Sequence, residues 1–202
     1  MNPAAETLPR AQRADARRNH EAVIEAARKL MATRGLDAQM DDIAREAGVG
    51  VGTVYRHFPT KDDLIYALAE RRFERLAEFA RDALAQADPG PAFEEFLLRC
   101  AELQAADRSL SEVMRDRPEA MRAGAQKAGL LELTRETMTR AQDAGAIRAD
   151  AEAEDVPMLM CGLGTTMPGN EGPFVTPTSW RRFIAIVIDG LRAPGAAEMP
   201  PR

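Results

Sequence analysis

The side chains best suited to chemistry in this 202-residue chain lie close together in its first third. They are hydrogen-bond donors of five kinds, a hydroxyl, a phenol, a guanidinium, an imidazole and an ammonium group, on Thr53, Tyr55, Arg56, His57 and Lys61. Such donors can reach the phosphate oxygens of a nucleic acid, and small residues beside them permit close approach to base edges. The small residues here are Val51 and Gly52. This stretch therefore predicts a surface that contacts a nucleic acid.

Outside this stretch, the sequence offers no arrangement typical of an enzyme. It has no glycine-rich phosphate-binding loop and no group of His, Cys and Asp residues at metal-ligand spacing. The two cysteines, Cys100 and Cys161, are isolated from each other and predict neither a metal site nor a disulfide framework. We interpret them as small apolar residues in a reducing cytosol. We therefore expect no catalytic residues, no metal and no cofactor.

A short helix and a tight turn precede the donors. The helix is predicted over about 40–47, where Asp41 and Asp42 in the first turn favour the positive end of the helix dipole. Residues 48–50, Gly-Val-Gly, form the turn, because glycine can adopt the positive φ that a helix-turn-helix requires.

A second short helix is predicted over about 51–58 to carry most of the donors. Val54 and Phe58, four residues apart, face inward and leave the donors on the opposite side. The proline that follows cannot continue this helix. Thr60 and Asp63 form a capping-box pattern that begins the next helix and places the lysine beside them in its first turn.

The distribution of charge supports a nucleic-acid partner, although the net charge of the chain is −5. Residues 10–61 contain ten lysines and arginines against seven acidic residues, whereas the remainder contains 17 against 25. The sequence therefore predicts a basic N-terminal region and an acidic remainder.

One string of residues, I-A-x-x-A-G-V-x-x-G-T-x-Y-x-H-F-x-x-K-x-x-L, runs from Ile43 to Leu64. It resembles the N-terminal region of the TetR family of bacterial transcriptional regulators. The resemblance covers about a third of the chain and extends to the remainder only in architecture. Where the family usually has a capping Thr or Ser, this chain has Gln39, a poor helix cap.

The resemblance implies which residues contact DNA. Backbone contacts are expected from Thr53, Tyr55, His57 and Lys61, while Val51 and Gly52 lie nearest the bases. Arg56 is either a base reader or a solvated surface residue. The full predicted set is Val51, Gly52, Thr53, Tyr55, Arg56, His57, Lys61, Arg18 and Met40. The arginines of the N-terminal tail are either a solvated terminus or an arm along the phosphates.

The fold predicted for the whole chain is all-α, with about nine helices. The first helix is expected to begin near Arg17–Asn19, with Asn19 as its cap, and a long helix over 61–87 joins the N-terminal head to a helical body. The predicted organisation is a flexible basic tail, a helix-turn-helix domain, a ligand-binding and dimerisation domain and a frayed tail, over 1–16, 17–62, 63–192 and 193–202.

Helical spacing of apolar residues predicts five helices in the body. They begin near Phe93 and Ser109 and then cover about 118–144, 151–167 and 180–191. Gly124 and Gly129, inside the third of these, permit either a bend or close packing.

Resemblance to the family implies a small-molecule pocket in this body, and its methionines suit an apolar or mixed ligand. The candidate ligand-binding residues are Phe96, Cys100, Gln104, Met114, Met121, Thr134, Met138 and Met160. An alternative interpretation of the methionines is ordinary helical core.

The resemblance also implies that the last two helices pair with those of a second copy. The helix over 180–191 has too many apolar residues for a helix buried on one side only. The candidate interface residues are Val156, Leu159, Leu163, Phe183, Ile184, Val187, Ile188 and Leu191. The alternative is that both helices complete a monomer core.

These patterns together predict a cytoplasmic, ligand-responsive repressor that binds a palindromic DNA operator as a homodimer. No apolar run approaches the roughly 18 residues that a membrane span needs, so no membrane partner is expected. The competing hypothesis is an all-helical small-molecule-binding protein or enzyme whose TetR-like head no longer binds DNA.

Overall fold

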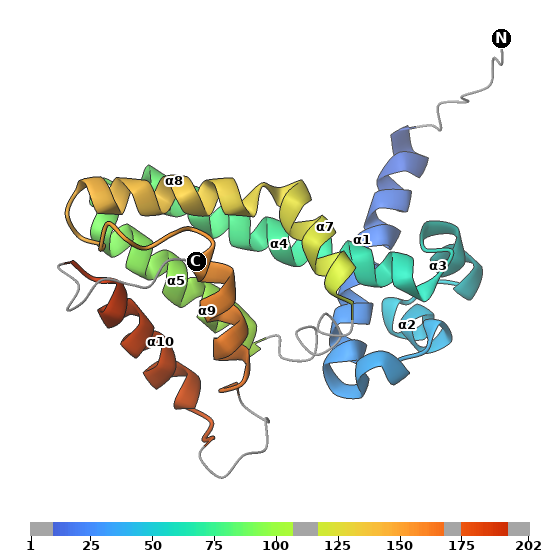
Figure 1. Cartoon of the computed structure of the whole chain (residues 1–202). Helices are drawn as coiled ribbons and strands as arrows, with labels where there is room; N and C mark the ends of the chain where they lie inside the picture. Colours follow the sequence, from blue (N-terminus) through green and yellow to red (C-terminus); the bar gives the residue numbers. More distant parts are fainter. Residues whose placement is uncertain (1–9, 107–116, 168–174, 194–202) are drawn as a thin grey trace. The chain divides into compact units, whose positions relative to one another are not determined.

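The computed structural model describes residues 10–106, 117–167 and 175–193, which are helical almost throughout (Figure 1). Within these ranges there are nine α-helices, one 3-10 helix and no strand, apart from an isolated bridge between Ile147 and Arg192. The predicted all-α fold is confirmed. No helix in the described ranges is both long enough and apolar enough to cross a membrane.

The chain forms two compact units, an N-terminal unit of residues 1–68 and a C-terminal unit of residues 69–202. The boundary falls inside the long helix α4 (Lys61–Ala85), a few residues beyond the boundary expected at 62. The N-terminal unit contains α1 (Arg10–Arg34), η1 (Gly35–Asp37), α2 (Met40–Ala47), α3 (Val51–His57) and the first two turns of α4.

Apolar residues from every α-helix of the N-terminal unit are buried in its core. The largest fully buried side chains come from α1, α2 and α4: Met31, Ile43, Leu64, Ile65 and Leu68. Val54 and Phe58 add the buried face of the α3 segment, with exposed fractions of 0% and 3%. The predicted inward face of this helix is confirmed.

Helix α1 begins earlier than the sequence predicts. It starts at Arg10 rather than near Arg17, so Asn19 lies inside the helix and is not its cap. The residues that extend it are mostly Ala, Arg and Gln, which are strong helix formers, and no Gly or Pro interrupts them. Part of the predicted flexible tail, from residue 10 onward, is therefore helical.

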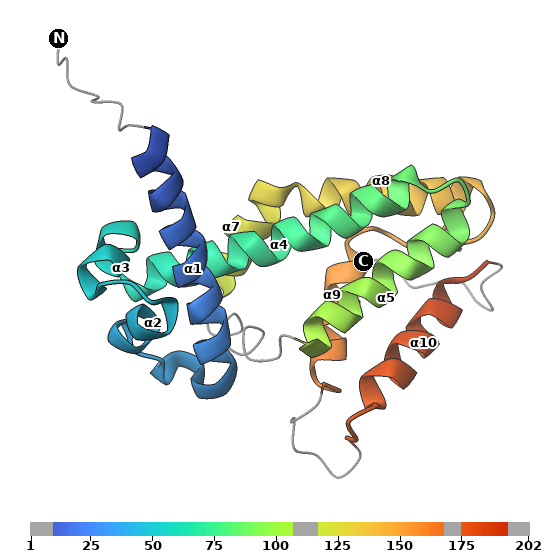
Figure 2. The ribbon, with the colours of Figure 1, turned by 180° about the vertical axis from the view of Figure 1, so that it is seen from behind.

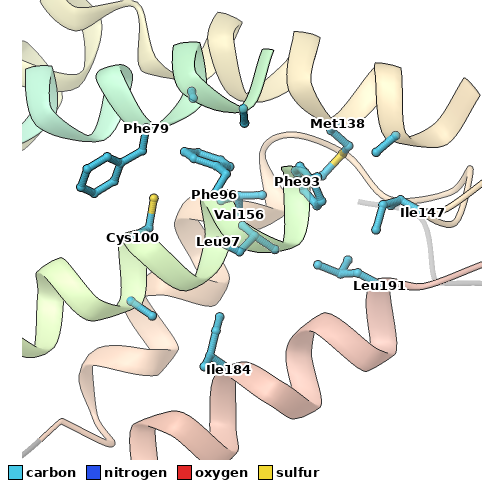
Figure 3. Close-up of a cluster of buried hydrophobic side chains, with 14 of the residues drawn as sticks. Phe79, Phe93, Phe96, Leu97, Cys100, Met138, Ile147, Val156, Ile184 and Leu191 are labelled. Carbon is cyan, nitrogen blue, oxygen red and sulfur yellow. The ribbon is translucent and has the colours of Figure 1, made fainter. Parts of the chain in front are cut away.

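The C-terminal unit is built around α5 (Pro89–Ala106), which lies against α8 (Leu130–Asp143), α9 (Asp155–Gly164) and α10 (Ser179–Leu191) (Figures 1 and 2). Figure 3 shows the core that these helices enclose. Phe93, Phe96 and Leu97 of α5 are at most 2% exposed, and Met138 of α8 packs with them.

The helix predicted over 118–144 is two helices, α7 (Pro118–Ala128) and α8. Gly129 separates them with φ +63°, a left-handed conformation that ends α7. Gly124 packs closely instead, because a Cβ there would lie 2.8 Å from Cδ2 of Phe73 and 3.1 Å from the backbone of Ala69 in α4. The two glycines thus have different roles, one a bend and the other a close approach.

Two further helix predictions need adjustment. The helix predicted over 151–167 is the shorter α9, and turns flank it on both sides. The short helix predicted near Ser109 lies outside the described residues. The last predicted helix is confirmed as α10, one residue longer than expected.

Candidate nucleic-acid interface

The turn between α2 and α3 is closed by hydrogen bonds within the backbone. The N–H of Gly48 donates to the carbonyl of Arg45 (3.2 Å) and that of Val49 to Ala44 (3.0 Å), the pattern of a Schellman motif. Gly48 has φ +68°, so the positive φ expected in the turn is confirmed there. Gly50 has φ −67° and serves as the N-cap of α3.

Helix α3 buries one face and leaves the opposite one open. Val51 and Tyr55 keep 43% and 48% of their surface exposed, which is unusual for large apolar side chains, and Arg56 is exposed beside them. Thr53 is half-buried. A Cβ built on Gly52 would meet nothing within 4 Å. The exposed face therefore presents the phenol of Tyr55 and the guanidinium of Arg56, with open space at Gly52. The sequence predicts this arrangement for a helix that approaches base edges.

The capping box at the start of α4 is confirmed. The N–H of Thr60 donates to Oδ2 of Asp63 (2.9 Å), and the N–H of Asp63 donates to Oγ1 of Thr60 (3.1 Å). Lys61, the first residue of the helix, is half-buried and its ammonium donates to the carbonyl of Leu36 in η1. This hydrogen bond links η1 to the start of α4 and fixes the position of the Lys61 ammonium group.

His57 is packed inside the N-terminal unit more than its predicted role requires. Its Nε2 is buried and has no hydrogen-bond partner among the described residues. The His57 ring meets His20 of α1 edge to face at 5.6 Å, and His20 stacks on Phe58 at 4.9 Å. Burial, and then the nearby charges of His20 and Arg56, lower the pKa of His57 below its usual 6.5. The predicted contact of His57 with a DNA phosphate stays a prediction.

Three other residues named in the sequence predictions, Met40, Arg18 and Gln39, have different surroundings in the structure. Met40 is only 7% exposed, so its side chain packs in the core, and a contact of this residue with DNA stays a prediction. Arg18 is exposed and forms an ion pair with Asp15 on the same helix. Gln39 is the N-cap of α2 without a side-chain capping bond, because its amide instead donates to the carbonyl of Asp37 (2.9 Å). The expectation that Gln39 is a poor cap is confirmed.

Asp42, expected to favour the helix dipole, also has two arginine partners in the structure. Asp42 accepts hydrogen bonds from Arg34 of α1 (2.8 Å) and Arg45 of α2 (2.7 Å). The spacing of Asp42 and Arg45 on one helix was a visible signal. The contact with Arg34 was not, because it joins two different helices.

The predicted ligand-binding residues divide between different places in the C-terminal unit. Phe96, Cys100 and Met138 are buried in one core cluster, with Met160 packed partly buried against it. Met121 packs in a second, smaller cluster around Phe73. Met114 lies outside the described residues.

The two polar candidates are bonded to the backbone. Oγ1 of Thr134, a residue 3% exposed, donates to the carbonyl of Leu130 (2.8 Å). The amide of Gln104 in α5 donates to the carbonyl of Met160 in α9 (3.3 Å). The described ranges contain no cluster of three or more His, Cys, Asp or Glu residues that could hold a metal ion.

Half of the predicted interface residues are buried within the chain itself. The exposed fractions of Val156, Leu163, Ile184 and Leu191 are at most 6%. The other four are half-buried and pack against the same cluster: Leu159, Phe183, Val187 and Ile188. On these two helices the large exposed apolar residues are Met158 of α9 and Ile186 of α10, each 62% exposed. Each lies on the face of its helix that is opposite the buried residues.

Comparison with known proteins places this fold in the class of helix-turn-helix transcriptional regulators. Residues 23–68 match the family described as "Bacterial regulatory proteins, tetR family", and residues 88–193 match "Transcriptional regulator SbtR-like, C-terminal domain". The chain belongs to the TetR family. Fold and family are thus those of transcriptional regulators and not of enzymes.

Individual relatives agree with this assignment. The TetR transcription regulatory protein from Mycobacterium vanbaalenii is 37% identical, over 90% of this chain and 99% of that chain, with a TM-score of 0.66. SCO0520 from Streptomyces coelicolor is 28% identical, over 88% and 99%, with a TM-score of 0.64. An HTH-type regulator of Staphylococcus aureus (strain USA300) is 43% identical over 60 residues, 29% of this chain. That match spans about a third of the relative, 32% of its length.

Proposed function

We propose that this TetR-family regulator is a ligand-responsive repressor that binds a palindromic operator as a homodimer in the cytoplasm. The observation that carries the proposal is the open face of α3, where Tyr55 and Arg56 are exposed while Val54 and Phe58 anchor the helix. Tyrosine joins an apolar ring to a polar hydroxyl, so Tyr55, half-exposed on a short and firmly anchored helix, is suited to an external partner. The phenol and the guanidinium are donors for backbone and base acceptors.

The dimer is proposed to form through the exposed faces of α9 and α10. Met158 and Ile186 are exposed on two helices that lie against each other within the subunit. A two-fold dimer would bury this patch of one subunit against the same patch of the other. Because Val156, Leu163 and their buried neighbours already fill the core, we assign the contact to the outer faces of these helices.

The response to a ligand is proposed to be a change between two dimer states. In the state that binds DNA, the two α3 helices lie about 34–36 Å apart, one turn of the double helix. A ligand that binds more tightly to a dimer with another spacing weakens operator binding. The loss of operator affinity cannot exceed the ratio of the ligand's affinities for the two dimer states. We place the ligand beside the core cluster of the C-terminal unit, where Met138 and Met160 offer adaptable apolar surface and Gln104 a polar group.

The test is a fluorescence-anisotropy titration of the dimer with duplexes selected from a random DNA library, at several salt concentrations. Tyr55→Ala should weaken binding about tenfold per half-site, because a hydrogen bond to a charged phosphate contributes roughly 1.5 kcal/mol. Tyr55→Phe removes the hydroxyl alone and should show most of that loss. Both variants should keep the helical circular dichroism of the parent, since Tyr55 is 48% exposed. Failure to select any duplex that binds in a salt-sensitive way would overturn the proposal.

A further inference from the structure

An apolar side chain stands at the leading end of the exposed face of α3. Val51 is the first residue of the helix and is 43% exposed, although valine is normally buried. Tyr55, one turn later, continues the same face, while Val54 fills the core from the other side. Packing within the chain therefore gives no reason for a β-branched apolar residue at this position.

The residues on both sides of Val51 are glycines, and neither has the positive φ for which glycine is needed. Gly50 has φ −67°, and Gly52 lies inside the helix without a positive φ. A Cβ added at either position would meet nothing within 4 Å. Glycine inside a helix lowers its stability, so its use at Gly52 calls for another reason, whereas Gly50 is the N-cap, where glycine is tolerated. Together they leave the Val51 side chain standing clear, with room for a partner to come close.

The proposed operator supplies a partner of matching chemistry. Helix α3 contains Arg56 and no acidic residue, so its open face can approach an anionic surface. In the major groove, the four bases present a single methyl group, the C5-methyl of thymine. Resting on the proposed function, we propose that Val51 reads a thymine in each half-site by packing its side chain against that methyl group.

Deoxyuridine tests this contact, because it pairs like thymine and differs only by the missing methyl group. In the selected duplex, each thymine of the half-site is replaced in turn by deoxyuridine, symmetrically in both halves, and affinity is measured by fluorescence anisotropy. Replacement at one position should weaken binding about fourfold per half-site, the equivalent of the roughly 0.8 kcal/mol gained when one methyl group leaves water. Replacement at the other positions should change affinity less than twofold.

The variant Val51→Ala completes a double-mutant cycle with the DNA. It should bind the thymine duplex more weakly and lose most of the difference between thymine and deoxyuridine at that position. Leu131→Ala is the matched control, an exposed apolar residue of α8 (38% exposed), and should keep the full difference. Thermal unfolding of Val51→Ala should match the parent.

The outcomes separate the two proposals. If no thymine position responds to deoxyuridine, or if Val51→Ala keeps the full response, the methyl contact is wrong while DNA binding stands. If no duplex can be selected, both proposals fail. A response that disappears only in Val51→Ala supports the assignment.

Discussion

At the scale of single residues, we expect a substitution of Gly52 to raise the stability of the protein and to weaken its binding to DNA. Replacing Gly52 with alanine should stabilise α3 by about 0.5–1 kcal/mol, because glycine inside a helix carries an entropic cost and the new methyl group meets nothing. The same methyl group would stand on the open face and hold bases away. We therefore expect Gly52→Ala to raise the melting temperature and to lower operator affinity, and Gly52→Val to lower affinity further.

A control for this prediction is Thr139→Ala, at an exposed position of α8. It also replaces a weaker helix former with a better one, so it should stabilise modestly without changing DNA affinity. If Gly52→Ala binds DNA as well as the parent does, the open face is not the contact surface.

His57 makes the stability of the N-terminal unit depend on pH. Its folded-state pKa lies below the usual 6.5 because burial disfavours the charged ring, with His20 and Arg56 adding to the effect. The unfolded chain therefore binds the proton more readily than the folded one. The contribution of neutral His57 to the free energy of unfolding is therefore complete above the unfolded-state pKa. It is lost as the pH falls from about 6.5 through the folded-state pKa.

The chain has two histidines, so NMR can follow both ring titrations directly. We expect the His57 signal to titrate below 6.5 and the melting temperature to fall between pH 7.5 and 5.5. His57→Gln should reduce that fall. An equal pH dependence of melting in the parent and in His57→Gln would contradict this account.

At the scale of helices, α4 depends on α8 for its C-terminal end. The last turn of α4 has no basic residue of its own. The guanidinium of Arg140 in α8 instead donates to the carbonyls of Leu84 and, at 3.2 Å, Gln86. Carbonyls at the end of a helix lack hydrogen-bond donors within the helix and carry partial negative charge. A guanidinium there donates the missing hydrogen bonds and offsets the charge.

Arg140→Ala should therefore lower the free energy of unfolding by about 1.5–3 kcal/mol, the range for hydrogen bonds with a charged partner. Urea unfolding followed by circular dichroism measures it. Arg135→Ala on the same helix is the control, since Arg135 forms surface ion pairs with Glu132 and Glu154 and its loss should matter less. Equal losses in both variants would show that Arg140 contributes only a surface charge.

At the scale of the whole molecule, the two cysteines report on assembly. Cys100 is buried, and burial raises the pKa of its thiol to about 12, so it should not react in the folded protein. Cys161 is exposed on α9, between Met158 and the end of the helix. If α9 and α10 form the dimer interface, its labelling by a thiol reagent should slow as protein concentration rises and the dimer forms.

Ile186→Asp should restore rapid labelling at high concentration, because a two-fold interface would place like charges on opposing subunits. Cys161→Ser should show no fast labelling at any concentration. A labelling rate for the parent that stays constant while gel filtration shows a dimer would exclude this face as the interface.

Much of the candidate DNA-binding surface was predictable because its causes are local. The capping box of Thr60 and Asp63, the left-handed Gly48 and the inward face of Val54 and Phe58 each depend on residues within a few positions of one another. Propensity, capping and turn chemistry act over that range, so the sequence by itself determined the helix-turn-helix and the all-α class.

The tertiary structure decided which groups remain free and which are used within the fold. The partners of His57 and Lys61 are His20 and Leu36, which lie on other elements of the N-terminal unit, so no spacing in the sequence indicates them. The same holds for the faces of α9 and α10. Helical periodicity places apolar residues on a helix but cannot say which of them its own chain will cover, because that depends on the elements that pack against it.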